Sequence, residues 1–534
     1  MIRIVSVEQM RRIEAAADAG GLTYDTMMQN AGKATARHAL AMLGNQPDAR
    51  VTVLVGKGNN GGDGLVAARV MAQESAALVR CYLLQKRPDD ALVEAARQAG
   101  VHIADAEDDQ GYRVLRQMIG SAHLVLDALF GIGIRLPLQG DVTRLLQVVN
   151  NTLEQVRAIE AEERIINPAY PAASDQKSRP PYVLAVDCPS GLNCDTGEVD
   201  THAVPADDTI TFIAAKPGLF TFPGAALTGN IVVATIGVPA DLPELNEVPL
   251  TLVDAEYTRQ RLPKRPVNSH KGTYGKALVI GGSANYRGAI ALATQATYRT
   301  GAGLVTTYTT EETITSVAGH VPEATWLPQN SVEPPSLADY DALLIGPGWG
   351  RAQSNQALLD QLLNHNPPAL IIDADGLNLL SEQDNWWQKL SPDTVITPHP
   401  GEMSRLSGLS TRDIQANRQE IAVQKAAEWQ VVLLLKGAHT LIAAPDGRVA
   451  MLPFKTDALA KAGSGDVLSG VIAGLLAQGL DAFDAAAVGG YVHGLAAVLA
   501  HQHMGTSRSV MASDVVAHLS SALTRIERAA SVEA

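Results

Sequence analysis

Short aliphatic runs recur along the whole chain, and each one stops at a loop of glycine or acidic residues. The run VTVLV at 51–55 stops at GKGNNGGDG, and the run KALVI at 276–280 stops at GGS. Such runs are typical of buried strands, and the longer stretches that follow them have the spacing of helices. This alternation predicts parallel sheets with helices packed on both faces, which is an α/β fold.

The length of the chain and one proline-rich connection predict two domains. At 534 residues the chain is too long for a single core, and two large domains fit. The alternation stops before the proline-rich segment 241–271 and restarts after it. We therefore predict a domain at 1–245, a linker at 246–264 and a domain at 265–534. The two halves repeat none of each other's motifs, so they are different domains rather than a duplication.

Charge and cysteine content exclude several classes of function. The formal charge of −14 argues against a nucleic-acid surface, because such a surface needs clustered Lys and Arg. Cys81, Cys188 and Cys194 form no Cys-x-x-Cys pair, so neither a disulfide framework nor a cysteine zinc site is expected. Residues 1–20 carry charges throughout, unlike a signal peptide, and we expect no run of membrane-spanning length. A cytoplasmic protein with no membrane partner fits this composition best.

The segment AGSGD at 462–466 is the first candidate for a reaction centre. Three small residues precede an acid and a long apolar run, so a helix is expected to start here. Unpaired N–H groups and the helix dipole favour an anion at such a start, and phosphate is the first suspicion. The Asp466 carboxylate would bind phosphate poorly but could take a proton from a hydroxyl that attacks it. The alternative is an ordinary helix start whose acid only complements the dipole.

Oxygen-bearing side chains follow three predicted strands of the first half. They are Asn59, Asn60 and Asp63 in the glycine-rich loop 56–64, and Asp127, Asp187 and Ser190 further on. The carboxyl ends of parallel strands meet at one edge of a sheet, so we expect these groups to converge. Hard oxygens suit a cation better than a soft metal. The glycine-rich loop has the spacing of neither a dinucleotide fingerprint nor a Walker loop, and its alternative interpretation is a tight turn without a ligand.

In the second half, too, each predicted strand ends in a polar or glycine-containing loop. The loops are GPGWG at 346–350, DADGLN at 373–378, TPHPGE at 397–402 and KGAHT at 436–440. Two residues in them have two interpretations each. His399 is either a site residue or a turn residue held by its two prolines, and Trp349 either stacks on a ligand or packs at the rim of the site.

The polar segment 151–181 ends in a stretch rich in proline, alanine and serine. This composition predicts an exposed insertion, to which we assign no function.

The ordered motifs resemble two known families. Residues 1–245 resemble the NAD(P)H-hydrate epimerase domain through GKGNNGGDG, LDALFGIG and VDCPSG. Residues 265–525 resemble the NAD(P)H-hydrate dehydratase domain of the ribokinase-like superfamily through HKGTYGKALVIGGS, GPGWG, DADGLN, TPHPGE, LLLKGAHT and AGSGD. The fused arrangement is similar to the bacterial bifunctional repair enzymes. It implies a Rossmann-like three-layer α/β/α epimerase domain followed by a ribokinase-like α/β domain.

For the first half, the resemblance implies a set of substrate contacts and a potassium site. The substrate contacts are Asn59, Asn60, Gly61, Gly62, Asp63, Gly131, Ile132, Gly133, Ile134, Arg135, Leu136, Pro137 and Asp187. Asn60, Asp127 and Ser190 match the potassium ligands, in agreement with the oxygen-rich cluster. We expect Asp187 to be the catalytic carboxylate of epimerisation.

For the second half, the resemblance implies a nucleotide site and a substrate site. The nucleotide site is Lys436, Gly437, Ala438, His439, Thr440 and Gly465. Ala289, Gly348, His399 and Asp466 match positions that contact the hydrated nicotinamide, and Asp466 is the expected catalytic base. The family usually has Asn-Pro-Gly-Met shortly before the AGSGD loop, where this chain has TDAL at 456–459.

The implied activity is the repair of hydrated NADH and NADPH, here called NADHX and NADPHX. The first domain would interconvert the R and S hydrates. The second would dehydrate the S hydrate to NAD(P)H, AMP and phosphate, with ADP and Mg2+ as phosphoryl donor, because a phosphorylated hydroxyl leaves more easily than hydroxide. The implied cofactor of the first domain is K+, and the implied assembly is a homo-oligomer such as a tetramer.

Two other functions compete with this interpretation. The first is a ribokinase-like vitamin or sugar kinase with a fused regulatory domain. A kinase would release a stable phosphorylated product, whereas the dehydratase would release free phosphate and reduced dinucleotide. The second makes the first domain a non-catalytic binding scaffold, and the presence of Asp187 with the potassium-ligand set argues against it.

Overall fold

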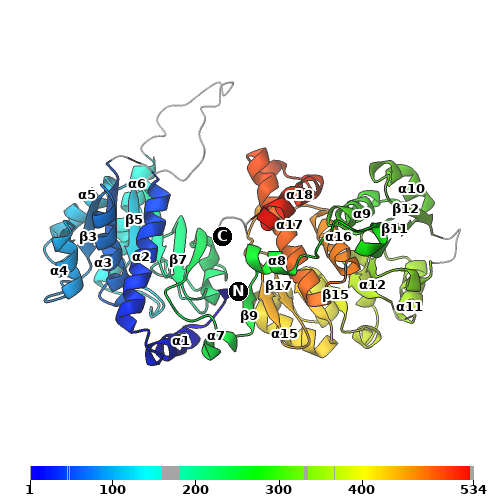
Figure 1. Ribbon diagram of the computed structural model, residues 1–534, viewed down its shortest axis with the longest axis horizontal. Helices are drawn as coiled ribbons and strands as arrows, with labels where there is room; N and C mark the ends of the chain where they lie inside the picture. The colour runs from blue at the N-terminus through cyan, green and yellow to red at the C-terminus, as the bar shows by residue number, and fades with distance from the viewer. Residues whose placement is uncertain are drawn as a thin grey trace, which may run out of the picture. The chain divides into compact units, whose positions relative to one another are not determined.

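The protein folds into two α/β units (Figure 1). The structure is a computed structural model, and it describes residues 2–44, 46, 48–158, 181–329, 335–365 and 367–528. The units are Ile2–Val248 and Pro249–Ala534. Each is described separately below.

The first unit is built on a parallel sheet with the strand order β4-β3-β2-β5-β6-β7-β8. Its strands are β2 (Arg50–Val55), β3 (Leu78–Leu83), β4 (His102–Asp105), β5 (Leu124–Ala128), β6 (Tyr182–Val186), β7 (Asp208–Phe212) and β8 (Asn230–Ala234). The chain winds outward from β2 to β4 and then returns to add β5 on the other side of β2. The loops after β2 and β5 therefore open at the switch point where such sheets bind ligands.

Helices cover both faces of this sheet (Figure 1). One face carries α2 (Tyr24–Leu43), α3 (Asn59–Glu74) and α4 (Ala91–Gln98), and the other carries α5 (Arg113–Gly120) and α6 (Asp141–Ala158). Side chains along β2 alternate between the two cores, because Val53 packs with α2 and α3 whereas Leu54 packs with α5 and α6. This arrangement confirms the three-layer α/β/α prediction.

Short elements complete the first unit. They are β1 (Ile2–Arg3), α1 (Val7–Ala19) and α7 (Pro243–Asn246). Helix α1 starts with a capping box, in which Ser6 accepts from the N–H of Gln9 and Gln9 accepts from the N–H of Ser6.

In the second unit the strand order is β9-β18-β17-β16-β15-β14-β13-β10-β11-β12. The strands are β9 (Leu250–Leu252), β10 (Lys276–Ile280), β11 (Leu304–Thr309), β12 (Thr325–Pro328), β13 (Ala342–Ile345), β14 (Ala369–Ile372), β15 (Thr394–Ile396), β16 (Val432–Leu435), β17 (Leu441–Ala443) and β18 (Val449–Met451). From β16 to β12 all neighbours are parallel, whereas β17 runs antiparallel to both β16 and β18. The polar loops of the parallel strands therefore share one edge.

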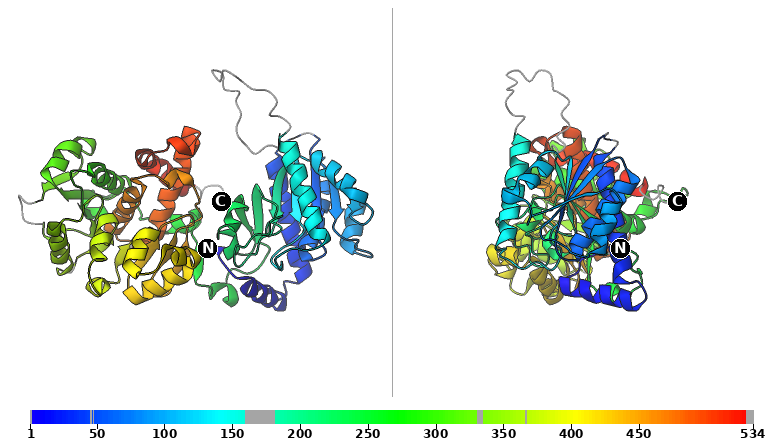
Figure 2. Two further views of the ribbon diagram at one scale, coloured as in Figure 1. Left: turned by 180° about the vertical axis from the view of Figure 1, so that it is seen from behind. Right: turned by 90° about the vertical axis from the view of Figure 1, so that its left-hand side faces the viewer.

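Helices also cover both faces of the second sheet (Figure 2). One core includes α9 (Arg287–Arg299), α16 (Ser464–Ala477), α17 (Ala482–Met504) and α18 (Ala512–Arg528). The other includes α11 (Gln353–Leu363), α12 (Ala374–Leu380), α13 (Pro400–Ser407) and α15 (Arg418–Trp429). The remaining helices are α8 (Ala255–Arg261), α10 (Glu311–Val317) and α14 (Thr411–Ala416).

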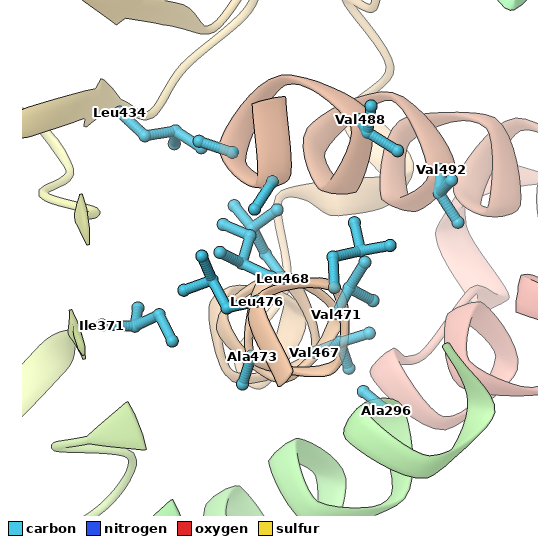
Figure 3. Close-up of a cluster of buried hydrophobic side chains, with 14 of the residues drawn as sticks. Ala296, Ile371, Leu434, Val467, Leu468, Val471, Ala473, Leu476, Val488 and Val492 are labelled. Carbon is cyan, nitrogen blue, oxygen red and sulfur yellow. The ribbon is translucent and has the colours of Figure 1, made fainter. Parts of the chain in front are cut away.

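Helix α16 is buried among the sheet and its neighbouring helices (Figure 3). Its apolar side chains contact the sheet residues Ile371 and Leu434, Val488 and Val492 of α17, and Ala296 of α9. Glycines allow the close approach: a Cβ on Gly470 would overlap the carbonyl oxygen of Ala293. The packing fixes α16 along its length and so fixes the position of its N-terminus, where the AGSGD segment lies.

Helix α17 corrects one expectation. Among the helices of the described residues, α17 alone is long and apolar enough to cross a membrane, so it was wrong to expect no run of that length. However, 72% of its most apolar window is buried inside the unit. Gly489 and Gly490 face Ile472 and Leu452 closely, as expected of a core helix.

Two segments differ from their expected form. The predicted linker 246–264 contains β9, which pairs with β18, and α8, so much of it belongs to the second sheet and its core. Its prolines lie outside these two elements, which explains why composition alone suggested a linker. The first residues of the predicted insertion 151–181 continue α6, where Thr152 and Leu153 are buried. Residues 159–180 lie outside the described residues.

Candidate active sites

Asp127 and Ser190 meet at the switch point of the first sheet. Asp127, in β5, is fully buried and accepts hydrogen bonds from the Ser190 hydroxyl at 2.6 Å and from the Ser190 N–H at 2.8 Å. The N–H of Leu129 donates a third bond at 3.3 Å. Burial raises the pKa of Asp127, and these bonds act in the opposite direction.

Asn60, which follows β2, has an unsatisfied side-chain amide. It stands in the first turn of α3, is 8% exposed, and neither its Oδ1 nor its Nδ2 has a hydrogen-bond partner. Because α3 begins at Asn59, residues 59–64 of the expected glycine-rich loop 56–64 are helical. Gly131 packs closely against both Asn60 and Asp187, since a Cβ on Gly131 would lie 3.1 Å from Asp187 Oδ2 and 3.4 Å from Asn60 Cβ. Asn60 and Asp187 therefore both lie close to Gly131, while Asp127 contacts Ser190, in agreement with the expected convergence.

These oxygens fit a hard cation better than a transition metal. Within the described residues, no group of three His, Cys, Asp or Glu side chains could hold a metal ion. The buried Asp127 carboxylate and the unsatisfied amide oxygen of Asn60 are, by contrast, groups that suit a hard cation.

Asp187 forms a buried ion pair that the motifs did not reveal. Lys216 Nζ lies 2.7 Å from Asp187 Oδ1 and 2.6 Å from the hydroxyl of Thr211, and Lys216 is 1% exposed. Thr211 also donates a hydrogen bond to Asp187. Asp187 has a φ of +66°, which turns the chain sharply at the end of β6. Lys216 lies in no glycine-rich loop, so no local sequence signal marks it.

A cavity of about 690 Å³ opens above this ion pair. Of the predicted substrate residues, it is lined by Asn59, Asn60, Asp63, Gly131, Ile132, Gly133, Ile134 and Asp187. Gly61 and Gly62 instead face the protein, against the Gly56 carbonyl and Met28, and Arg135, Leu136 and Pro137 are not part of the lining.

Helix α1 adds charged groups that the sequence did not assign to this cavity. Arg11 and Glu14 line it together with Asp63 and Asp187. Burial and the charge of Asp187 raise the pKa of Glu14, and the same two causes raise that of Asp63 well above its usual range. Several carboxyl groups thus share the cavity with the single buried ammonium of Lys216.

The second site is centred on an ion pair between Lys436 and Asp373. Lys436 follows β16, Asp373 follows β14, and the Nζ–Oδ1 distance is 2.5 Å. Asp373 is 1% exposed, and its Oδ2 has no hydrogen-bond partner. A Cβ on Gly465 would lie 3.2 Å from Lys436 Nζ, so the AGSGD segment passes directly over this pair.

Asp466 stands in the first turn of α16, as the sequence predicts. The helix begins at Ser464 after Gly463, whose φ of +90° suits glycine. Burial raises the pKa of Asp466 to about 7, with a further contribution from Asp373 that Lys436 partly offsets. A carboxyl group with this pKa can accept a proton near neutral pH.

His399 caps helix α13, which supports the interpretation as a turn residue. Its Nδ1 accepts from the N–H of Gly401 at 2.9 Å, and Glu402 completes the capping box by accepting from the His399 N–H. Burial and the nearby Lys436 lower the pKa of His399, and burial raises that of Glu402 to about 6. The imidazole is half exposed, so it can cap the helix and still face the site.

Two of the predicted substrate positions lie in contact. A Cβ on Gly348, in the loop after β13, would be 2.8 Å from the Cβ of Ala289 on α9. Asp375 connects this loop to the centre, because it accepts from the N–H of Gly350 at 2.8 Å and its charge raises the pKa of Asp466. Trp349, next in the loop, is 1% exposed and packs in the core, as the packed interpretation expects.

The predicted nucleotide loop 436–440 turns one side chain inward. His439 is buried and contacts the carbonyl of Leu452, and burial lowers its pKa to about 4. Gly437 faces the guanidinium of Arg418, which donates to the carbonyl oxygens of Leu435 and Lys436. Arg418 stands on α15 with no motif around it, and the sequence did not predict its role in shaping this loop.

Residues 456–459, which depart from the family pattern, support the AGSGD loop. They form a short 3-10 turn, Asp457–Leu459, capped by Thr456. The Ser464 hydroxyl donates to the carbonyl of Leu459 at 2.8 Å. The turn therefore holds the start of α16 with a direct hydrogen bond.

Comparison with known proteins identifies both halves. Residues 24–218 match the family model described as YjeF-related protein N-terminus, and residues 277–520 match the one described as NAD(P)H-hydrate dehydratase. The chain is 36% identical over 530 residues to the bifunctional NAD(P)H-hydrate repair enzyme of Moorella thermoacetica, covering 94% of this chain and 92% of the relative. It is 35% identical over 517 residues to that of Coxiella burnetii, covering 96% and 97%. Among solved structures, an ADP/ATP-dependent NAD(P)H-hydrate dehydratase from Bacillus subtilis, co-crystallised with ATP/Mg2+, is 32% identical with a TM-score of 0.46, covering 52% of this chain and 99% of that chain. The full-length matches show that the chain belongs to the family of bifunctional NAD(P)H-hydrate repair enzymes.

Proposed function

We propose that the second unit dehydrates the S hydrates of NADH and NADPH by phosphoryl transfer from ADP, and that the first unit supplies the S form by epimerisation. The dehydratase assignment rests on one cluster: the Asp466 carboxyl at the start of α16, beside the Lys436–Asp373 ion pair. A base, a cation and unpaired helix N–H groups are the parts that phosphoryl transfer to a hydroxyl needs.

In this proposal Asp466 takes the proton of the ring hydroxyl while the hydroxyl oxygen attacks the terminal phosphorus of ADP. A new O–P bond forms, and the bond between that phosphorus and the bridging oxygen breaks to release AMP. The lone pair of the ring nitrogen then expels phosphate, and loss of a proton from the adjacent ring carbon restores the reduced nicotinamide. The N–H groups of Gly463 and Gly465 stabilise the transferring group, whereas the N–H of Ser464 donates to the carbonyl of Lys461 at 3.3 Å.

The donor lies on the Lys436 side of the centre in this proposal. The loop 436–440 and Gly465 provide backbone groups for it, and Lys436 provides a positive charge against its phosphates. Mg2+, when bound with ADP, would neutralise phosphate charge, and the unsatisfied Asp373 Oδ2 is the carboxylate oxygen best suited to face it.

In the first unit, Asp187 acts on the same hydroxyl in a different way. It takes the hydroxyl proton while the ring C–N bond opens to an aldehyde and the nitrogen gains a proton. Reclosure on the other face of the aldehyde gives the other epimer and returns both protons. Lys216 holds the Asp187 carboxylate in its orientation through its 2.7 Å contact.

Potassium belongs to the first unit in this proposal. Asn60, Asp127 and Ser190 would hold it, and its charge would compensate the buried Asp127 carboxylate. The unsatisfied amide of Asn60 is the observation that supports the site.

Product analysis tests the dehydratase assignment. With purified S-NADHX and ADP, the wild-type chain should form reduced dinucleotide, AMP and free phosphate in equal amounts. Asp466→Asn should still bind ADP and should lose turnover by at least about a hundredfold, as expected for loss of a general base. A stable phosphorylated dinucleotide as the end product would instead indicate a kinase.

A further inference from the structure

Opening and reclosing the hydrated ring moves two protons, and Asp187 accounts for one of them. In the proposed epimerisation the hydroxyl proton goes to Asp187, while the electron pair of the C–N bond moves onto the ring nitrogen, which gains the other proton. Asp187 Oδ1 is engaged by Lys216 and Thr211, whereas Oδ2 lies toward Gly131 in the wall of the cavity. If both protons move in one step, a second group has to serve the nitrogen.

The cavity of the first unit is lined by several titratable or charged side chains. They are Arg11, Glu14, Tyr24, Asp25, Lys57, Asp63, Asp187 and Lys216. Lys216 is unsuited to serve the nitrogen, because its buried ammonium already donates to Asp187 and Thr211. Arg11 is also unsuited, because a guanidinium keeps its proton in proteins.

The remaining groups of this lining are either exposed or half-buried. The exposed ones are Tyr24, Asp25 and Lys57, and solvent water competes with a substrate for their protons. The half-buried ones are the carboxyls of Glu14 and Asp63. Neither carboxyl takes part in a hydrogen bond or ion pair within the described residues, so both can face a ligand.

Helix α1 places Glu14 beside the reacting groups. Arg11 precedes it by one helical turn, so both side chains face the cavity. The charges of Asp187 and Lys216 act on Glu14 from the sheet. Helix α7 also packs against α1, and its acid, Glu244, is exposed. Glu14 thus shares a confined space with the carboxylate that is proposed to act on the hydroxyl.

Asp63 is the other candidate, and its surroundings hold its proton more firmly. Burial and the charges of Asp187 and Glu14 raise its pKa well above the usual range, and Lys216 opposes this rise. Burial and Asp187 also raise the pKa of Glu14, but there both Lys216 and Arg11 oppose the rise. A group that gives up a proton and takes it back works best when its pKa lies near the operating pH, which favours Glu14.

We propose that Glu14 is a second catalytic residue of epimerisation, which protonates the ring nitrogen when the C–N bond opens and takes that proton back when the ring recloses. On opening, the O–H bond breaks toward Asp187, the C=O bond of the aldehyde forms, the C–N bond breaks, and the new N–H bond takes its proton from Glu14. Reclosure on the other face reverses each transfer, so no proton is consumed. The inference rests on the proposed epimerase function and adds to it the group that acts on the nitrogen.

The test follows conversion of R-NADHX to S-NADHX by the full-length protein without ADP, after subtraction of the rate without protein. Glu14→Gln keeps the size of the side chain but cannot exchange a proton, so it should lower kcat at least about a hundredfold and leave KM within about threefold. Because Glu14 acts in its protonated form, kcat/KM of the wild type should fall as the pH rises on the alkaline side. This decline should be absent from Glu14→Gln.

A second variant separates proton transfer from a structural role. Glu14→Ala leaves a space in which formic acid can replace the missing carboxyl. Added formate should therefore raise its epimerisation rate in proportion to the formate concentration. Glu14→Gln should not respond, because its side chain fills that space.

Glu8→Gln is the matched control, because Glu8 is an exposed carboxyl on the same helix. It should keep the rate and the pH profile of the wild type. Epimerisation by Glu14→Gln within about threefold of the wild type would overturn the assignment. A loss that leaves the pH profile unchanged and is not relieved by formate in Glu14→Ala would overturn it too, since a structural role behaves in this way. A wild type that interconverts the epimers no faster than solution without protein would instead overturn the epimerase proposal itself.

Discussion

Lys216 and Asp187 form an ion pair in which the ammonium is 1% exposed and lies 2.7 Å from the carboxylate, at the base of the first cavity. Thr211 bonds to both partners and fixes their orientation. A lysine so deeply buried is rare unless it is paired, and here the pair sits where the epimerase chemistry is proposed. The first prediction concerns this lysine.

Lys216→Ala should reduce enzyme-catalysed epimerisation at least about a hundredfold, because Asp187 loses its partner and its orientation. It should also destabilise the first unit by roughly 3 kcal/mol, since one partner of a buried pair is removed. Epimer interconversion and thermal unfolding measure the two effects. Lys33→Ala, at an exposed position of α2, is the control and should change neither. Normal epimerisation by Lys216→Ala would show that the pair has no catalytic role.

Dehydration should depend on pH through Asp466. Its pKa is raised to about 7, and the base must be deprotonated, so kcat/KM should fall about tenfold per unit below that value and level off above it. Glu402→Gln keeps the capping bond to His399 but removes a charge that raises the Asp466 pKa. The acid limb of the variant should therefore move to lower pH. The assignment would be contradicted if kcat/KM of the wild type did not fall below pH 7 and if Glu402→Gln left the pH profile unchanged.

Potassium should stabilise the first unit if Asn60 and Asp127 bind it. The ionic strength is kept constant by replacing tetramethylammonium chloride with KCl. Each tenfold rise of the K+ concentration above the Kd should then add about 1.4 kcal/mol to the free energy of unfolding. Thermal unfolding measures this shift. Asn60→Leu fills the space of the unsatisfied amide without offering an oxygen, and it should abolish the dependence. The same K+ response in Asn60→Leu as in the wild type would exclude this site.

The close packing of α16 on α9 predicts a pair of opposite glycine effects. Gly470→Ala places a Cβ against the Ala293 carbonyl oxygen and 2.9 Å from the Ala296 Cβ, so it should destabilise the second unit by roughly 1–3 kcal/mol. Gly288→Ala, on α9, meets nothing within 4 Å and should leave stability unchanged or raise it by up to about 1 kcal/mol. Urea unfolding of the two variants compares them directly, and equal effects would argue against the packing described here.

The sequence predicts the features that depend on local patterns. The ends of strands in glycine or acidic loops and the helix start within the AGSGD segment both follow from neighbouring residues, and the structure contains them. Asp127 and Ser190 meet as expected, because parallel strands align their carboxyl ends.

Features that depend on contacts between distant segments were not predictable. Lys216 and Arg418 reach their sites from positions with no motif, and Arg11 and Glu14 reach the first cavity from α1. The strand β9 is recognisable only through its pairing with β18, since three residues among prolines carry no periodic signal. The hydrogen bonds that cap α13 support the turn interpretation of His399, whose role at the site stays a prediction.

The most direct test of the central claim measures how much of an R and S NADHX mixture the full-length protein returns to NADH in the presence of ADP, K+ and Mg2+. The wild type should return nearly all of the mixture to NADH. Asp187→Asn should return only the S fraction, apart from the R form that epimerises slowly without the enzyme, and Asp466→Asn should return almost none. Recovery of both epimers by Asp187→Asn at the wild-type rate, or of either epimer by Asp466→Asn at that rate, would contradict the division of labour between the two sites.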